Sequence, residues 1–317
     1  MLRGLPVGAL AAVCLLASGA ALPQEPVFRG VGEAVRVFVT VTNRDGRLVT
    51  NLARTDFEVR DDGQAQPITQ FDNTPVPIRL VVMLDVSGSM AGNLTLLRSA
   101  ALQLFSRLGP EDEARVGSFG HDITISEPFT RDQHALLDAL PTTIAPDAPT
   151  PLWRALDQAM NTFGAPRADV RPVILVLSDG KDADTPSFRH RLVSQAEVIE
   201  RARREDVMMY AIGMRSRPAH RQPPGVGPGS LQGMLLADLP DPGLARVAEE
   251  TGGGYTEIRF GQDLGAAFAA VADELHSQYL LGFVPPRHDG KTHAISVRLA
   301  QAHLKARARK SYVAPRS

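Results

Sequence analysis

Apolar positions follow two alternating patterns along the middle of the chain, and these predict strands and helices in turn. Residues 79–84 and 173–177 (RLVVML and VILVL) are almost continuously apolar, as in parallel strands buried on both faces. Residues 94–108 instead carry apolar side chains every three or four positions, which is typical of a helix. Further strands are predicted at residues 114–119, 123–128, 207–212 and 255–258, and further helices at residues 152–163, 193–204, 243–250 and 264–275. Strands that alternate with helices predict an α/β fold, doubly wound around a mostly parallel sheet.

The two ends of the chain are rich in strands alone. Residues 35–42 (VRVFVTVT) alternate in polarity and are β-branched, and strands are also predicted at residues 57–60, 68–71, 279–284, 293–299 and 305–313. The C-terminal strands have nothing of their own to pack on. Because chain termini commonly lie close together, we expect both ends to form one small β-sandwich-like unit.

These patterns divide the chain into four segments. They are a signal peptide at residues 1–21, an N-terminal β segment at 22–77, the α/β domain at 78–278, and a C-terminal β segment at 279–317 that packs with the N-terminal one. Proline-rich residues 73–77 (NTPVP) predict a stiff linker before the α/β domain. Residues 217–230 (RPAHRQPPGVGPGS) predict an exposed, mobile loop.

The N-terminus has the features of an export signal. Arg3 precedes an apolar run at residues 7–16, and small residues follow at 18–21. The run is shorter than the roughly 20 apolar residues that a membrane span needs, which favours cleavage over an N-terminal anchor. We therefore expect an exported protein, periplasmic, at the cell surface or secreted, with no membrane span after cleavage. Cleavage would also remove Cys14, the single cysteine.

Composition excludes some partners. Apolar residues make up 44% and charged residues 22% of the chain, as in an ordinary globular protein, and the formal net charge is −1. No basic field is present to attract nucleic acid, so partners must be recognised at local sites.

Oxygen-bearing side chains cluster where the predicted parallel strands end. Asp85, Ser87 and Ser89 follow the first apolar strand, Asp179 follows the VILVL strand, and Thr150 precedes the helix at 152–163. Ligands of open α/β sheets bind beyond the carboxyl ends of the strands, so we expect these loops to meet. Oxygen-only ligands suit a hard cation, Mg²⁺ or Mn²⁺, with Ca²⁺ as an alternative. In an extended turn Asp85, Ser87 and Ser89 would point the same way, and Gly88 would let the backbone wrap closely around an ion.

The Asp-x-Ser-x-Ser motif at Asp85 resembles the metal-ion-dependent adhesion site of von Willebrand factor type A (VWA) domains, and Thr150 and Asp179 match its later parts in order. The resemblance implies that Ser87, Ser89 and Thr150 bind the ion through their hydroxyl groups, with the aspartates at or just behind the ion. One position would stay open for an Asp or Glu of a partner protein. The flanking segments, including TGGGY and ELHSQYLLGFVPP, resemble a bacterial subgroup of these proteins, although Ser311 stands where a glycine is expected.

Each of these residues also has a purely structural interpretation. Ser87 and Ser89 would cap the following helix, Thr150 would cap the helix at 152–163 with Pro151 at its first position, and Asp179-Gly180 would form a turn. Thr142 and Thr143 are rivals of Thr150, and Asp122 and Asp182 are candidates for carboxylates behind the ligands.

Three functions remain open at this point. The first, which we expect, is a non-enzymatic, metal-dependent protein-binding module for adhesion or scaffolding. The second is a structural envelope or secretion component that does not use the ion. The third is a metal-assisted hydrolase with Asp85 as nucleophile, which lacks a general base near the motif.

Overall fold

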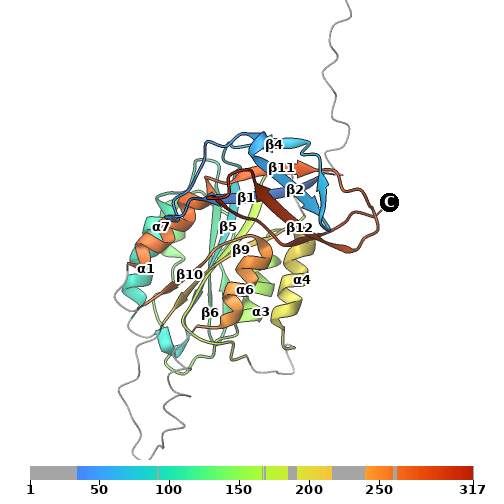
Figure 1. The fold of residues 1–317 in the computed structure, drawn as a ribbon. Coiled ribbons are helices and arrows are strands. Elements are labelled where there is room, and N and C mark those ends of the chain that lie inside the picture. The colour runs from blue at the N-terminus through green and yellow to red at the C-terminus, as the bar shows by residue number, and fades with distance from the viewer. Residues whose placement is uncertain are drawn as a thin grey trace, which may run out of the picture. The chain divides into compact units, whose positions relative to one another are not determined.

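The computed structural model describes residues 34–90, 93–165, 167, 169–184, 191–215, 240–259 and 263–316 (Figure 1). The predicted signal peptide and the predicted loop at 217–230 lie outside the described residues. Of the helices within those ranges, none combines the length and the apolar character that crossing a membrane requires.

A six-stranded sheet forms the centre of the fold, in the order β10-β9-β8-β5-β6-β7. All neighbours run parallel except β6 and β7. The strands are β5 (Ile78–Asp85), β6 (Glu113–Phe119), β7 (Ile123–Ile125), β8 (Arg171–Ser178), β9 (Met208–Met214) and β10 (Tyr255–Ile258). The two strands predicted from continuous apolar runs, β5 and β8, lie side by side in the middle, where both faces are buried.

Helices cover both faces of this sheet, as Figure 1 shows. Side chains alternate along β5, so that Leu80, Val82 and Leu84 pack against one set of helices while Val81 and Met83 pack against the other. The first set is α1 (Leu94–Phe105), α2 (Gln133–Asp138) and α7 (Leu264–Leu275), and the second is α3 (Leu152–Met160), α4 (Gln195–Glu205) and α6 (Pro242–Thr251). The predicted doubly wound α/β class is therefore confirmed, although the apolar pattern did not predict the short helix α2.

Segments from the two ends of the chain pair in two small antiparallel sheets. One has the order β13-β1-β11-β4 and the other β14-β12-β2-β3. Their strands are β1 (Val35–Thr42), β2 (Phe57–Asp61), β3 (Gln64–Gln66), β4 (Gln70–Asp72), β11 (Tyr279–Phe283), β12 (Thr292–Leu299), β13 (Lys305–Arg307) and β14 (Ser311–Val313), with a 3₁₀ turn at Arg54–Asp56. Apolar residues of both sheets, such as Val37, Val59 and Leu281, share a third core. The fold thus includes the expected small β-sandwich-like unit.

The prediction of one continuous strand at residues 305–313 is wrong. β13 pairs with β1 in one small sheet, whereas β14 pairs with β12 in the other. The chain crosses between the sheets at Lys310, whose carbonyl accepts from the Ile295 amide at 2.7 Å. A crossing strand keeps its alternating side chains, so the sequence pattern did not reveal the break.

The small β unit lies beyond the amino ends of the central strands. Arg171, the first residue of β8, stacks on Phe38 of β1 with its guanidinium carbon 4.5 Å from the ring centre, and hydrogen-bonds to Gln278 just before β11. The carboxyl ends of β5 and β8, where the predicted ligands lie, are consequently at the opposite edge of the central sheet.

Candidate metal centre

Asp85 is the anchor of the candidate centre. It is the last residue of β5, and its side chain is 0% exposed. Its Oδ1 accepts a hydrogen bond from the Ser87 amide at 2.8 Å, and its Oδ2 accepts one from the Ser178 hydroxyl at 2.5 Å. The carboxylate is therefore fixed in direction by both its own loop and the neighbouring strand.

Ser87 and Ser89 connect Asp85 to Asp179. The two serine hydroxyl oxygens lie 3.0 Å apart, and Ser89 Oγ donates to Asp179 Oδ1 at 2.6 Å. The expected extended turn is wrong, because Gly88–Met90 forms a 3₁₀ turn closed by the Met90 amide on the Ser87 carbonyl. Both hydroxyl groups nevertheless face the same side. Ser87 is buried and Ser89 is exposed, so the cluster opens to the surface at Ser89.

Thr150 approaches the cluster from a third loop. Its side chain is buried, and a Cβ on Gly180 would lie 3.1 Å from Thr150 Oγ1. The Thr150 carbonyl also accepts from the Ala183 amide at 2.8 Å, which ties this loop to the one after β8. The rival residues Thr142 and Thr143 are both exposed.

The helix-capping interpretations of these residues do not match the structure. The N-cap of α1 is Asn93, and the N-cap of α3 is Pro151 rather than Thr150. The start of α3 is held by Asp182, whose Oδ1 accepts from the Trp153 amide at 3.3 Å. Asp182 thus supports the helix beside the site, while Asp122 is an exposed turn residue whose backbone carbonyl accepts from Gly120.

Ser178 is a further residue of the candidate centre, which the sequence pattern did not predict. It ends β8, is 0% exposed, and joins Asp85 to the loop after the strand by accepting from the Gly180 amide at 3.2 Å. Its position at a strand end, next to Asp179, was the available signal.

The electrostatics of the cluster favour a bound cation. Burial raises the pKa of Asp85 to about 6, and the nearby negative charge of Asp179 adds to the rise, while hydrogen bonds from Ser178 and Ser87 oppose it. Two carboxylates in a buried setting repel each other, and a positive charge between them would relieve both effects.

The residues fit a hard divalent cation. All five predicted ligands carry oxygen, which is the donor that Mg²⁺ and Mn²⁺ prefer. Gly88 lets the loop after β5 pass close to the backbone at Pro146, because a Cβ at position 88 would lie 1.9 Å from the Pro146 carbonyl oxygen. Such close packing of loops is what a compact ion site needs. Three loops, after β5, before α3 and after β8, thereby place their hydroxyl and carboxylate groups at one edge of the sheet.

Comparison with known proteins identifies one family. Residues 80–223 match the family model described as von Willebrand factor type A domain. This range contains Asp85, Thr150 and Asp179. No curated protein matches the chain as a relative.

Several solved structures resemble the chain in fold. An aerotolerance-related membrane protein from Bacteroides fragilis is 15% identical, with 62% of this chain and 98% of that chain covered and a TM-score of 0.44. The ArnB paralog VWA2 from Sulfolobus acidocaldarius is 18% identical, with 89% and 76% covered and a TM-score of 0.43. Proximal thread matrix protein 1 from the mussel byssus, with a zinc-occupied MIDAS motif, is 18% identical, with 67% and 48% covered and a TM-score of 0.43.

Proposed function

The chain contains a von Willebrand factor type A domain, and from this premise we propose that it is an exported, metal-dependent protein-binding module. Domains of this family commonly mediate metal-dependent protein interactions. The proposed ligands are Asp85, Ser87, Ser89, Thr150 and Asp179, and the proposed partner is a protein that presents an Asp or Glu side chain.

The convergence of three loops supports this proposal most directly. Ser89 of the first loop bonds to Asp179 of the third at 2.6 Å, and Thr150 of the second approaches Gly180 beside it. The residues are far apart in the sequence, and a helix-capping role does not account for Ser87, Ser89 or Thr150. A shared ligand is the simplest reason for hydroxyl and carboxylate groups to meet in this way.

Each protein group has a definite task in this mechanism. The Ser178 hydroxyl and the Ser87 amide hold the Asp85 carboxylate in one orientation, so little rearrangement is needed when an ion arrives. The exposed Ser89 marks the side from which a partner can approach. The bound cation would supply a fixed positive charge for the partner's carboxylate, and the surrounding loops would add specificity.

Binding fits the cluster better than catalysis does. The hydroxyl groups of Ser87, Ser89 and Ser178 already form hydrogen bonds within the cluster, and Asp85 is fully buried. A buried carboxylate that is held by two donors is well placed to orient ligands and poorly placed to attack a substrate.

Metal uptake is the first test. Calorimetry with Mn²⁺ and with Mg²⁺ on the purified chain should show one site, and Ser89→Ala should weaken it about tenfold or more. Thr142→Ala is the matched control, because Thr142 is an exposed threonine in the loop that leads to Thr150. If the unaltered chain takes up neither ion, the proposed function is wrong.

Partner binding is the second test. Proteins captured from an envelope extract with Mn²⁺ should be released by a chelator and should not be captured by Ser89→Ala. The released partner should then lose affinity when single Asp or Glu residues at its contact surface are changed to Asn or Gln. A partner that binds equally well with the chelator present would support the structural-component function instead.

A further inference from the structure

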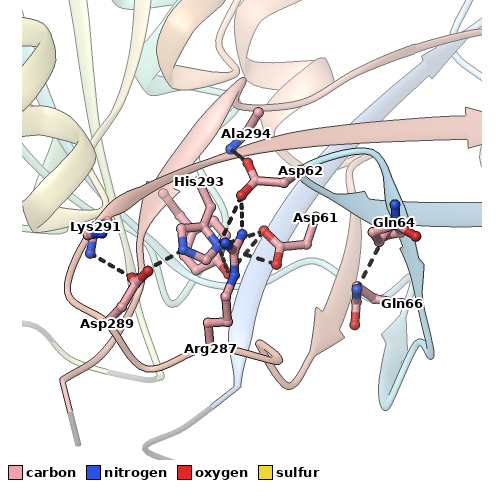
Figure 2. Close-up of polar contacts among 10 residues, drawn as sticks. Asp61, Asp62, Gln64, Gln66, Arg287, Asp289, Lys291, His293 and Ala294 are labelled. Carbon is pink, nitrogen blue, oxygen red and sulfur yellow. Dashed lines mark hydrogen bonds and ion pairs between the residues drawn. The ribbon is translucent and has the colours of Figure 1, made fainter.

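A second cluster of ionisable side chains lies in the small β unit, as Figure 2 shows. Asp61 ends β2, Asp62 follows it in the turn, and His293 lies on the neighbouring strand β12. The side chains of His293 and Asp61 are 2% and 1% exposed, whereas that of Asp62 is 40% exposed. Asp289 completes the group on the other side of the imidazole ring.

Both nitrogens of the His293 ring face carboxylates. Nδ1 lies 3.0 Å from Asp61 Oδ1 and 3.8 Å from Asp62 Oδ2, and Nε2 lies 3.2 Å from Asp289 Oδ1. A neutral imidazole carries one N–H, and a carboxylate only accepts hydrogen bonds. One of the two contacts is therefore an ordinary hydrogen bond, and the other sets a ring lone pair against carboxylate oxygens, an arrangement that a second proton or a metal ion would relieve. The hydroxyl of Tyr312, 3.4 Å from Nδ1, is a neutral donor beside them.

The charges around the ring favour a divalent ion over a proton. Asp62 accepts a hydrogen bond from the Ala294 amide at 2.9 Å, and Asp289 accepts one from the Lys291 amide at 2.9 Å, and such bonds stabilise the charged form of each carboxylate. With Asp61 and the guanidinium of Arg287, which pairs with Asp62, the groups in ion-pair contact around a neutral ring carry a formal charge of −2, and the exposed Lys291 adds a more distant positive charge. A proton leaves half of this charge in a largely buried site, whereas a divalent cation neutralises it.

We propose that Asp61, Asp62 and His293 form a second metal site, which binds Zn²⁺ in preference to Mg²⁺ and Mn²⁺. An imidazole nitrogen with two carboxylate oxygens is a typical ligand set for Zn²⁺ and a poor one for Mg²⁺. The side-chain atoms already lie within 4.8 Å of one another. In a tetrahedral Zn²⁺ site, ligand atoms lie roughly 3.3 Å apart, so the separations of 3.0 and 3.8 Å from Nδ1 need only small adjustments.

The surroundings of the ring prepare it for this role. Asp289 offers Nε2 an acceptor at 3.2 Å. With the ring proton on Nε2, the Nδ1 lone pair would face Asp61 and Asp62, the arrangement of many histidine ligands of zinc. The hydroxyl of Tyr312 lies 3.3 Å from Asp61 Oδ1 and steadies that carboxylate.

Arg287 acts as the competitor of the ion. Its side chain is 53% exposed and pairs with the half-exposed Asp62, so it can move away into solvent and open the site from that side. The ion would then link β2 to β12 through Asp61 and His293, which are 232 positions apart in the sequence. This second site is independent of the proposed function of the α/β domain, because it uses none of the same residues.

Metal titration of the full chain separates the two sites. Calorimetry with Zn²⁺ should show one equivalent that is lost in His293→Gln and retained in Ser89→Ala. His303→Gln is the matched control, because His303 is an exposed histidine of the same small unit. Co²⁺ in place of Zn²⁺ should give an intense visible absorption band only when His293 is present, since four-coordinate sites absorb far more strongly than six-coordinate oxygen sites.

The Arg287→Ala variant distinguishes a metal site from an ion-pair network. If Arg287 competes for Asp62, its removal should tighten Zn²⁺ binding, and saturating Zn²⁺ should raise Tm by an amount on the order of 5 °C. Asp62→Asn changes a half-exposed residue and should weaken Zn²⁺ binding about tenfold or more without unfolding the chain. Unchanged Zn²⁺ stoichiometry in His293→Gln, or no tightening in Arg287→Ala, would overturn the proposal and leave a proton-bridged ion-pair cluster.

Discussion

Ser178 donates a hydrogen bond of 2.5 Å to Asp85 across the adjoining ends of β8 and β5. Both side chains are 0% exposed, and this contact joins the two central strands at the edge where the candidate metal centre lies. The same hydroxyl accepts from the Gly180 amide at 3.2 Å, so it also positions the loop that carries Asp179. Ser178 is therefore a positioning residue for both carboxylates.

Replacing Ser178 by alanine should destabilise the chain. Asp85 Oδ2 would lose its hydroxyl donor inside the protein, and a buried polar atom left without a partner costs about 1–3 kcal/mol. Denaturant unfolding measures this loss, and Mn²⁺ titration should show weaker uptake. Ser106→Ala is the control, because the Ser106 hydroxyl is exposed and bonds only to the Gln103 carbonyl of its own helix turn among its described contacts. Equal losses of unfolding free energy in the two variants would show that the buried Ser178–Asp85 bond stabilises the chain no more than an exposed hydrogen bond does.

Replacing Gly88 by alanine should push the loop after β5 away from the loop that contains Pro146. The added Cβ would lie 1.9 Å from the Pro146 carbonyl oxygen, which is backbone and cannot rotate away. The two loops must separate, at a cost of about 1–3 kcal/mol, and Ser87 and Ser89 move with them. We expect a lower Tm and loss of Mn²⁺ uptake by calorimetry. Gly46→Ala, where a Cβ meets nothing within 4 Å but φ is +77°, should lose stability and keep the metal.

The contribution of Asp85 to the stability of the metal-free chain should fall as the pH rises from about 4 to about 6. Burial raises the pKa of Asp85 from 3.8 to about 6, so in this window the folded state holds a proton that the unfolded state has released. Stability from this group is then greatest at low pH and is lost by neutral pH, by an amount on the order of 3 kcal/mol. The difference between unfolding curves of the unaltered chain and of Asp85→Asn, at several pH values in the presence of a chelator, measures the effect.

The Asp85→Asn variant tests this pH dependence by removing the group that titrates. Asparagine keeps the shape of the side chain and carries no charge, so the metal-free variant should be more stable than the unaltered chain at pH 7 while taking up no Mn²⁺. A variant that is less stable at pH 7 and keeps the same pH slope would show that Asp85 does not titrate in this window.

The arrangement of the central sheet was predictable because burial leaves a strong pattern. β5 and β8 appear as almost continuous apolar runs, and the strand ends at Asp85 and Asp179 follow directly from them. Once the order of strands and helices is known, the meeting of these loops is a consequence of the parallel sheet. The residue types at the strand ends then indicated an oxygen-ligand site.

Details that depend on packing were not predictable from the sequence. The burial of Thr150 and the exposure of its rivals Thr142 and Thr143 depend on the path of a loop rich in proline and alanine, which has no periodic pattern. The pairing of His293 with Asp61 joins residues 232 positions apart through a strand register that only the assembled small unit defines. The break between β13 and β14 was hidden for the same reason.

Arg171 should prove hard to replace even by lysine, because it joins the central sheet to the small β unit. Its guanidinium is 2% exposed, donates to Gln278 Oε1 and to the Leu275 carbonyl at 2.8 Å, and stacks on Phe38. Lysine keeps the charge but has no planar group to make these contacts together, so Arg171→Lys should cost about 3 kcal/mol in denaturant unfolding. Hydrogen exchange of the β1 amides should also accelerate, which local damage to β8 alone does not predict. Arg107→Lys, at an exposed ion pair with Asp273, should cost less than about 0.5 kcal/mol, and a similar cost at both positions would contradict a coupling role for Arg171.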